Sequence, residues 1–279
     1  MSTSSLPPTL EVVDSHPAFQ VGLLGPVQPE DLDQSYLDAV ATPSWLRELG
    51  LEDSRTNVRC LNQRTRFAKR ILDIVVASTL LVLTAPLIAA AALAVKLSSP
   101  GPILFSQIRV GLNLRKGSAC GGDCDDQCRR QEPNYGRPFR IYKIRTMHLA
   151  ASKSGPKQAK ASDSRVFAVG RLLRRMRIDE LPQLVNVLLG NMSMVGPRPE
   201  CIEYMEELEA KVPGYSQRLG LKPGLTGIAQ IESGYANDLD SYRRKAAYDF
   251  IYLQNCCVSN DLRIMYRTLK VVFTGFGAL

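Results

Sequence analysis

The stretch IVVASTLLVLTAPLIAAAALAV, residues 74–95, decides how this chain folds, because it holds 22 consecutive residues without a formal charge. A helix of that length can cross the hydrocarbon core of a bilayer. The sequence therefore predicts a membrane-embedded helix in the first part of the chain.

Two features favour a helix that enters and leaves the membrane on the same side. Pro86 lies in the middle of the stretch, where it is expected to kink or break the helix. Both flanks are basic, with Arg64, Arg66, Lys69 and Arg70 before the stretch and Lys96, Arg109, Arg115 and Lys116 after it. Lysine and arginine prefer the cytoplasmic side. We therefore predict a re-entrant, Pro-broken membrane helix over residues 66–97, with a spanning helix as the alternative.

The charge of the chain is divided unevenly. The first 53 residues carry nine acids and one arginine, a net −8, so the total of +8 leaves +16 on the remainder. We predict that residues 1–65 form a largely disordered acidic tail. Within this tail, a short helix near residues 29–51 is either transient or docked. The basic remainder predicts an anionic partner such as lipid headgroups or a phosphorylated substrate. No nucleic acid is expected, because the chain has no recognisable nucleic-acid-binding motif.

Beyond the membrane stretch, the pattern predicts an α+β, mainly helical domain over residues 98–279. Alternating segments within 98–117 and 140–147 are typical of strands and predict a small β-hairpin. On the second strand, Lys143 and Arg145 would share one face, where they either clamp a diphosphate or are simply solvated. Charged or amphipathic helices are expected over residues 201–211 and between 239 and 279, and residues 222–230 predict a turn followed by a β-like segment.

A second stretch, GRLLRRMRIDELPQLVNVLLGNMSMVGPRPE at residues 170–200, predicts the chemistry. An adjacent carboxylate pair, Asp179 and Glu180, is bracketed by five arginines, namely Arg171, Arg174, Arg175, Arg177 and Arg198. We predict that Asp179 caps a helix that has Pro182 in its first turn and ends near Gly190. A helix N-terminus favours anions, including a bound phosphate. The alternative is an ordinary capping aspartate beside a solvated arginine face.

Seven cysteines and no signal peptide at the start are typical of reduced cytoplasmic thiols. Three of them, Cys120, Cys124 and Cys128, are spaced four apart and would share one face of a helix. A soft metal is conceivable there, but a closed zinc site needs four ligands and no histidine is near in sequence. The alternative is a surface insertion without a ligand.

Several motifs together resemble the bacterial sugar transferases, the monotopic polyprenyl-phosphate phosphoglycosyl transferases. In chain order they are FAKRILDIVVAS, SPGPILFSQIRVG, GRPFRIYKIRTM, DSRVFAVGRLLRRMRIDELPQLVNVLLGNMSMVGPRPE, LKPGLTGIAQ and YDFIYLQN. The resemblance covers residues 66–279, and DELPQL with MSMVGPRPE in one chain is a specific combination. It implies a re-entrant membrane helix and a catalytic domain on the cytoplasmic face of the bacterial inner membrane.

The resemblance also implies a reaction. The aspartate that matches Asp179 attacks the sugar-bearing phosphorus of a UDP-sugar, releases UMP and forms a covalent phosphosugar-enzyme. Polyprenyl (undecaprenyl) phosphate then takes the sugar phosphate, which starts the assembly of exopolysaccharide, capsule or lipopolysaccharide. By analogy Glu180 is the ligand of a Mg2+ cofactor and the second catalytic residue. The candidate substrate contacts are Lys143, Arg145, Arg174, Arg175 and Arg198.

Two departures from the family pattern stand out. The family places an arginine after the glycine that follows the PG-TG-AQ segment, where this chain has Ser233-Gly234-Tyr235. Residues 118–135, which carry the three cysteines, form an insertion in the catalytic domain. A non-catalytic membrane scaffold for glycan assembly is the alternative function, although such a scaffold would not need the carboxylate pair. The sequence leaves open the sugar, the glycan, the purpose of the tail and cysteines, and whether the chain forms a homo-oligomer.

Overall fold

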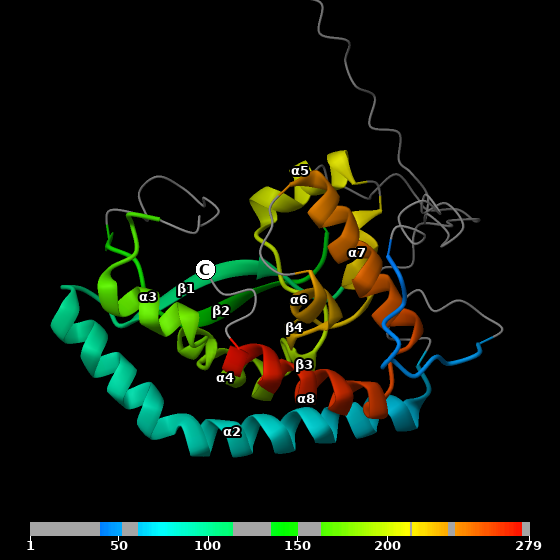
Figure 1. Cartoon of the computed structure of the whole chain (residues 1–279), viewed down its shortest axis with the longest axis horizontal. Helices are drawn as coiled ribbons and strands as arrows, with labels where there is room; N and C mark the ends of the chain where they lie inside the picture. The colour runs from blue at the N-terminus through cyan, green and yellow to red at the C-terminus, as the bar shows by residue number, and fades with distance from the viewer. Residues whose placement is uncertain are drawn as a thin grey trace, which may run out of the picture.

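The computed structural model describes residues 40–51, 61–113, 135–149, 163–212, 214–233 and 238–274. Figure 1 shows a mainly helical molecule in which one long helix runs along one side and the other elements pack above it. In the labels of Figure 1, the elements are α2 (Gln63–Ser98), β1 (Leu104–Val110), β2 (Pro138–Ile144), α3 (Ala168–Arg175), η3 (Ile178–Glu180), α4 (Gln183–Leu188), β3 (Ser193–Val195), α5 (Ile202–Lys211), η4 (Tyr215–Gly220), β4 (Gly224–Thr226), α6 (Ile228–Glu232), α7 (Leu239–Gln254) and α8 (Val258–Thr274). The predicted α+β, mainly helical class is confirmed.

Helix α2 contains the apolar stretch, and within the described residues it is the one helix long and apolar enough to cross a membrane. Its start is capped by Asn62, whose side chain accepts a hydrogen bond from the Thr65 N–H at 2.7 Å. The sequence predicted a kink or a break at Pro86, and the break is wrong, because α2 is one helix of 36 residues that contains Pro86. Proline removes only one backbone donor, and a helix accommodates that loss by bending. Figure 1 shows α2 as one ribbon that changes direction along its length.

The first turns of α2 are fixed by buried charges. Lys69 donates to the Tyr252 hydroxyl of α7 at 2.8 Å and forms an ion pair with Asp261 of α8. Asp73 accepts hydrogen bonds from the Ser193 hydroxyl at 2.9 Å and the Met194 N–H at 2.8 Å, both on β3. A buried charge costs several kcal/mol unless it is paired. These contacts therefore set how α2 lies against β3, α7 and α8.

The other end of α2 packs against the same body of the protein. Ala91 and Val95 belong to a small core cluster with Ile144, Phe167, Leu173 and Ile178. Between the two ends, Val82 and Leu83 are 73% and 68% exposed. Helix α2 is thus held at both ends, and it presents apolar side chains outward between them.

Two small sheets lie above α2. Strands β1 and β2 pair antiparallel, with Leu104 opposite Ile144, and confirm the predicted β-hairpin. Strands β3 and β4 pair in parallel, with Ser193 opposite Gly224. The sequence did not predict this second pair, because three-residue strands are too short to show an alternating pattern. Glycine is required here, since a Cβ on Gly224 would lie 2.1 Å from the Gly196 nitrogen.

The later helices follow the sequence pattern. Helices α5, α7 and α8 confirm the expected helical segments, and strand β4 confirms the β-like segment expected within residues 222–230. The Pro-Gly turn predicted there is wrong, because Gly224 already pairs with Ser193 as the first residue of β4. The predictions for Cys120, Cys124, Cys128 and Tyr235 lie outside the described residues, as does most of the insertion at 118–135.

Residues 40–51, which we call the strap, lie against α6, α7 and α8. The described residues of the strap form turns rather than the helix predicted for residues 29–51. Pro43 accepts a hydrogen bond from the Leu46 N–H at 2.9 Å, which closes a tight turn. The N–H groups of Arg47 and Leu49 donate to Asn260 and Asn255 instead of to helical carbonyls. Side chains at the C-cap of α7 and on α8 therefore override the local helical pattern.

A glycine on α3, Gly170, allows this helix to approach the segment that follows β2 closely. An added Cβ on Gly170 would lie 2.3 Å from the Thr146 carbonyl oxygen. We expect Gly170→Ala to lower the free energy of unfolding by about 1–3 kcal/mol, because the backbone must shift to relieve the overlap. Thermal unfolding of the detergent-solubilised protein measures the effect. The matched control is Gly50→Ala, where nothing lies within 4 Å of the added Cβ. Equal melting temperatures for the two variants would contradict this packing.

Candidate active site

The carboxylate pair lies in η3, directly after an unusual backbone turn. Arg177 has a φ of +58° and is the one non-glycine residue with positive φ among those described. This left-handed conformation separates α3 from η3. The predicted capping role of Asp179 is wrong, because Asp179 lies inside η3 and α4 begins only at Gln183 after Pro182. The predicted helix end is confirmed, since Gly190 follows α4 with a φ of +80°.

Glu180 is bound by two cations from distant parts of the chain. Its Oε1 accepts a hydrogen bond from Lys143 Nζ on β2 at 2.6 Å and another from Arg198 Nη2 at 2.9 Å. Burial alone would raise the pKa of Glu180, but Arg198 and Lys143 outweigh it and hold that pKa well below its usual range. Glu180 is therefore an ionised anchor that brings β2 and the loop after β3 together.

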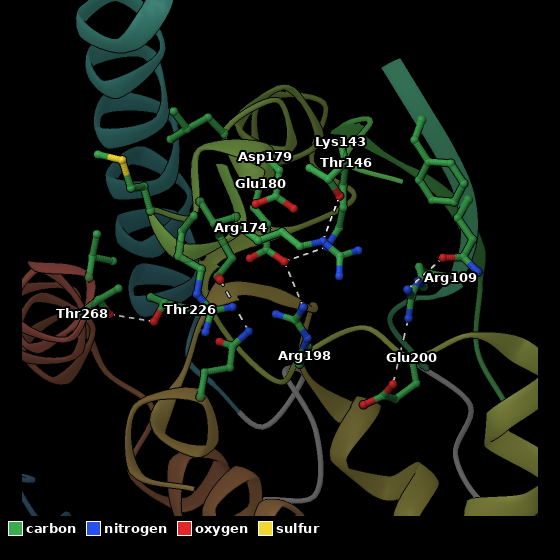
Figure 2. A pocket seen from close by; sticks show the side chains of 18 of the residues that line it. Arg109, Lys143, Thr146, Arg174, Asp179, Glu180, Arg198, Glu200, Thr226 and Thr268 are labelled. Carbon is green, nitrogen blue, oxygen red and sulfur yellow. Dashed lines mark hydrogen bonds and ion pairs between the residues drawn. The ribbon is translucent and has the colours of Figure 1, made fainter. Parts of the chain in front are cut away.

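Asp179 has the opposite electrostatic character. Its side chain is buried, and burial together with the neighbouring charge of Glu180 raises the pKa of Asp179 to about 6. Lys143, Arg174 and Arg177 limit this rise by favouring the charged form. Figure 2 shows the two carboxylates side by side, with Arg174 and Arg198 close to them. A desolvated carboxylate that is ionised near neutral pH is suited to act as a nucleophile.

Arg198 is held from both sides. Its neighbours Pro197 and Pro199 restrict the backbone, and its carbonyl oxygen accepts a hydrogen bond from Arg218 Nη2 at 2.6 Å. Arg218 is itself buried and forms an ion pair with Asp249 at 2.8 Å. A fixed backbone lets Arg198 present its guanidinium to the site at little entropic cost.

The other predicted substrate contacts divide into three cases. Arg174 lines the cavity described below, and its Nε donates to Thr146 Oγ1 at 2.8 Å. Arg145 also lines the cavity, but its guanidinium donates to Ser99 and Pro102 at the end of α2. Arg175 is exposed and lies outside the cavity lining. Its predicted role therefore has the least geometric support.

A cavity of about 1170 Å³ lies over the carboxylate pair. One side of it, the cationic wall, includes Arg109, Lys143, Arg174, Arg177, Arg198 and Lys245. Its acidic lining residues are Asp179, Glu180, Glu200 and Asp249. The sequence had not singled out Arg177 or Lys245 as contacts, and it had assigned Arg109 only to a basic flank. An excess of cations in a partly buried cavity favours a ligand with several negative charges.

The other side of the cavity, the apolar wall, is formed by α2, α6, α8 and β4. It includes Val76, Leu80, Leu225, Ile231, Met265 and Leu269. Thr226 of β4 and Thr268 of α8 join across it, with their hydroxyl oxygens 2.7 Å apart (Figure 2). One cavity thus offers both a charged surface and an apolar surface.

The donor set limits which metal the protein can hold. Among the described residues, no group of three or more histidine, cysteine, aspartate and glutamate side chains could hold a metal ion. The two neighbouring carboxylates do fit Mg2+, which is commonly bound through one or two carboxylates while substrate phosphates and water supply the remaining ligands.

Comparison with known proteins gives a consistent match. The family model described as bacterial sugar transferase matches residues 64–120 and 125–275.

Three similar proteins are a UDP-N-acetylgalactosamine-undecaprenyl-phosphate N-acetylgalactosaminephosphotransferase of Aeromonas hydrophila, and UDP-glucose:undecaprenyl-phosphate glucose-1-phosphate transferases of Caulobacter vibrioides and Escherichia coli. They are 40%, 42% and 38% identical to the chain over 76%, 74% and 76% of its length. The aligned part of the chain spans 45%, 70% and 40% of the lengths of these relatives.

The charge of Glu180 is predicted to affect the pKa of Asp179. We expect Asp179 to be ionised above pH about 6 and protonated below it, following its raised pKa. Glu180→Gln should lower the pKa of Asp179, because it removes the neighbouring negative charge. A 13C NMR titration of aspartate-labelled protein measures this pKa. The control is Glu203→Gln, an exposed glutamate on α5. An unchanged pKa of Asp179 in Glu180→Gln would contradict the coupling.

Proposed function

We propose, from the premise that this chain belongs to the bacterial sugar transferase family, that it transfers a sugar 1-phosphate from a UDP-sugar to polyprenyl phosphate and releases UMP. One observation carries this proposal: a buried, ionisable Asp179 lies in a cavity with one cationic and one apolar wall. The names of the relatives support the same substrates, but they differ in the sugar. The sugar therefore remains to be identified by experiment.

In the proposed first step, a carboxylate oxygen of Asp179 attacks the phosphorus that carries the sugar. A bond forms between this oxygen and the phosphorus, the diphosphate bond breaks, and its electron pair leaves on the phosphate oxygen of UMP. The product is an aspartyl-phosphosugar enzyme. The raised pKa of Asp179 matches this role, since it keeps the carboxylate basic while leaving it ionised at neutral pH.

The cationic wall counters the repulsion between this carboxylate and the diphosphate. Lys143 and Arg198 already contact Glu180 beside the nucleophile, and the positive charges of Arg174 and Arg177 act on Asp179 itself. Fixed positive charges in a cavity stabilise the charge that develops on the phosphate oxygens and on UMP.

In the second step, a phosphate oxygen of polyprenyl phosphate attacks the same phosphorus. The bond to Asp179 breaks, its electron pair returns to the carboxylate, and polyprenyl-diphospho-sugar leaves. The apolar wall supplies a surface for the first isoprene units of this acceptor. The order of events corresponds to ping-pong kinetics.

Magnesium is part of the proposal. Glu180, together with Asp179 before it is modified, would hold the ion. The ion would neutralise charge on the phosphate oxygens of the substrate. A bound ion would compete with Lys143 and Arg198 for Oε1 of Glu180.

We further propose that α2 is re-entrant and that the protein lies on the cytoplasmic face of the bacterial inner membrane. Both ends of α2 contact the same body, through Lys69 and Asp73 at one end and Ala91 and Val95 at the other. A helix that crossed the bilayer would place its two ends on opposite sides, away from a common partner. A soluble nucleotide-sugar and a lipid phosphate would meet at this surface, where glycan assembly begins.

The nucleophile assignment predicts a loss of turnover. Wild type should release UMP from at least one member of a UDP-sugar panel in the presence of polyprenyl phosphate and Mg2+. Asp179→Asn should lower this rate by several orders of magnitude, because the amide cannot form the acyl phosphate. Membrane association of the variant should be unchanged, and Glu203→Gln serves as the matched control. Full activity of Asp179→Asn would exclude the mechanism. Wild type that is folded and membrane-bound but releases no UMP would favour the scaffold function.

The re-entrant helix predicts labelling from one side only. In a cysteine-depleted background, Gln63→Cys and Ser98→Cys at the two ends of α2 should both react with a membrane-impermeant maleimide on the cytoplasmic side. Val82→Cys, in the exposed middle of α2, should be shielded by lipid from either side. Labelling of the two ends from opposite sides of the membrane would show instead that α2 spans the bilayer.

A further inference from the structure

The strap, residues 40–51, precedes the family-matched region and yet belongs to the fold. Its Val40 and Leu46 are buried in the main hydrophobic core. Trp45, the single tryptophan of the chain, joins two helices. Its indole N–H donates to Glu232 of α6 at 3.1 Å, and the guanidinium of Arg267 on α8 lies 4.5 Å from the centre of its ring. The strap therefore connects α6 to α8.

Two buried asparagine side chains form hydrogen bonds with the backbone of the strap. Asn260 accepts a hydrogen bond from the Arg47 N–H at 3.1 Å and donates to the Arg47 carbonyl at 3.0 Å. Asn255 accepts from the Leu49 N–H at 2.9 Å. Asn260 is fully buried, so loss of the strap would leave its polar atoms without these partners. Docking of the strap is therefore specific rather than incidental.

The strap and the cavity use different faces of α8. Asn260, Arg263 and Arg267, which contact the strap, follow an i, i+3, i+7 spacing and share one face. Met265, Thr268 and Val272, which line the cavity, follow the same spacing on roughly the opposite face, while Val271 lines the cavity from close to the strap side of α8.

Helix α6 shows the same division within one turn. Ala229, Gln230 and Ile231 line the cavity, and the next residue, Glu232, accepts the hydrogen bond from Trp45. The strap thus contacts both helices from behind the apolar wall.

We propose that the strap positions the apolar wall by holding α6 and α8 together, and that it thereby sets the affinity for the polyprenyl phosphate acceptor. Trp45 is a positioning residue, because it contacts Glu232 and Arg267 rather than the cavity. The inference rests on the proposed function, in which the apolar wall receives the acceptor. Apart from Lys245 on α7, the cationic wall lies on β1, β2, α3, the turn after α3 and the loop after β3, so the donor half of the reaction should be independent of the strap.

Two half-reactions separate this role from a general loss of structure. Wild type, Trp45→Ala and Glu48→Ala are compared; Glu48 is an exposed residue of the same strap and serves as the matched control. The donor half-reaction is measured as UMP release without acceptor, and the acceptor half-reaction as transfer to a short-chain polyprenyl phosphate. We expect Trp45→Ala to raise the KM for the acceptor about fivefold, a typical size for coupling between two sites. Its UMP burst, and both half-reactions of Glu48→Ala, should match wild type.

Other outcomes have distinct meanings. An acceptor KM for Trp45→Ala that equals the wild-type value would overturn the inference while leaving the proposed function intact. Equal losses in both half-reactions, with a lower melting temperature, would show a structural role only and would also overturn it. Glu232→Ala and Arg267→Ala, which remove the two partners of Trp45, should reproduce the effect on the acceptor KM. Wild type without any UMP release would instead count against the proposed function.

Fluorescence tests the inference without relying on turnover. Because coupling between two sites is reciprocal, a short-chain polyprenyl phosphate bound at the apolar wall should change the emission of Trp45. The titration is made in detergent micelles, with binding followed in parallel by equilibrium dialysis of the radiolabelled lipid phosphate. The same titration with UDP, which has no polyprenyl chain, should leave the emission unchanged. Bound lipid phosphate without a change in emission would overturn the inference, whether or not the enzyme turns over.

Discussion

The contact on which the rest of the structure depends is the buried ion pair between Lys69 and Asp261, completed by the Tyr252 hydroxyl. It joins the start of the apolar helix α2 to α7 and α8. Breaking such a pair by removing one partner typically costs about 3–5 kcal/mol, because the other charge stays buried without compensation. One turn further along α2, Asp73 binds β3 through hydrogen bonds from the Ser193 hydroxyl and the Met194 N–H. Helix α2 is therefore a fixed base for the other elements rather than an independent anchor.

From this base, the position of the candidate site follows step by step. Strand β3 leads directly into the loop that carries Arg198, and Arg198 reaches Glu180. Lys143 reaches the same carboxylate from β2. Glu180 thus uses its charge to hold the site together, while Asp179 keeps a raised pKa close beside it. Two adjacent carboxylates acquire different properties because only one of them is directly bonded to cations.

The sequence predicted the parts of this arrangement that depend on periodic or local signals. The 22 uncharged residues of α2, the alternation of β1 and β2 and the amphipathic pattern of α7 and α8 all extend over enough residues to be recognised. The carboxylate pair and several of its arginines were also identifiable. The parallel pairing of β3 with β4 was not, because it depends on the close approach of Gly196 and Gly224. The capping role assigned to Asp179 failed because Arg177 adopts a left-handed backbone, which propensity does not predict for arginine.

Two residues show where tertiary structure overrides a local signal. Alternation along the strand suggested that Arg145 and Lys143 would both face a diphosphate, but β2 ends at Ile144 and Arg145 turns to the carbonyl groups at the end of α2. Arg145 thereby fixes the C-terminal end of α2 close to the hairpin, while Lys69 fixes the other end. The exposed apolar middle of α2 is thus carried by a helix whose two ends are joined to the site. In the proposed reaction, a lipid phosphate could then reach Asp179 along the apolar wall without its chain crossing the cationic wall.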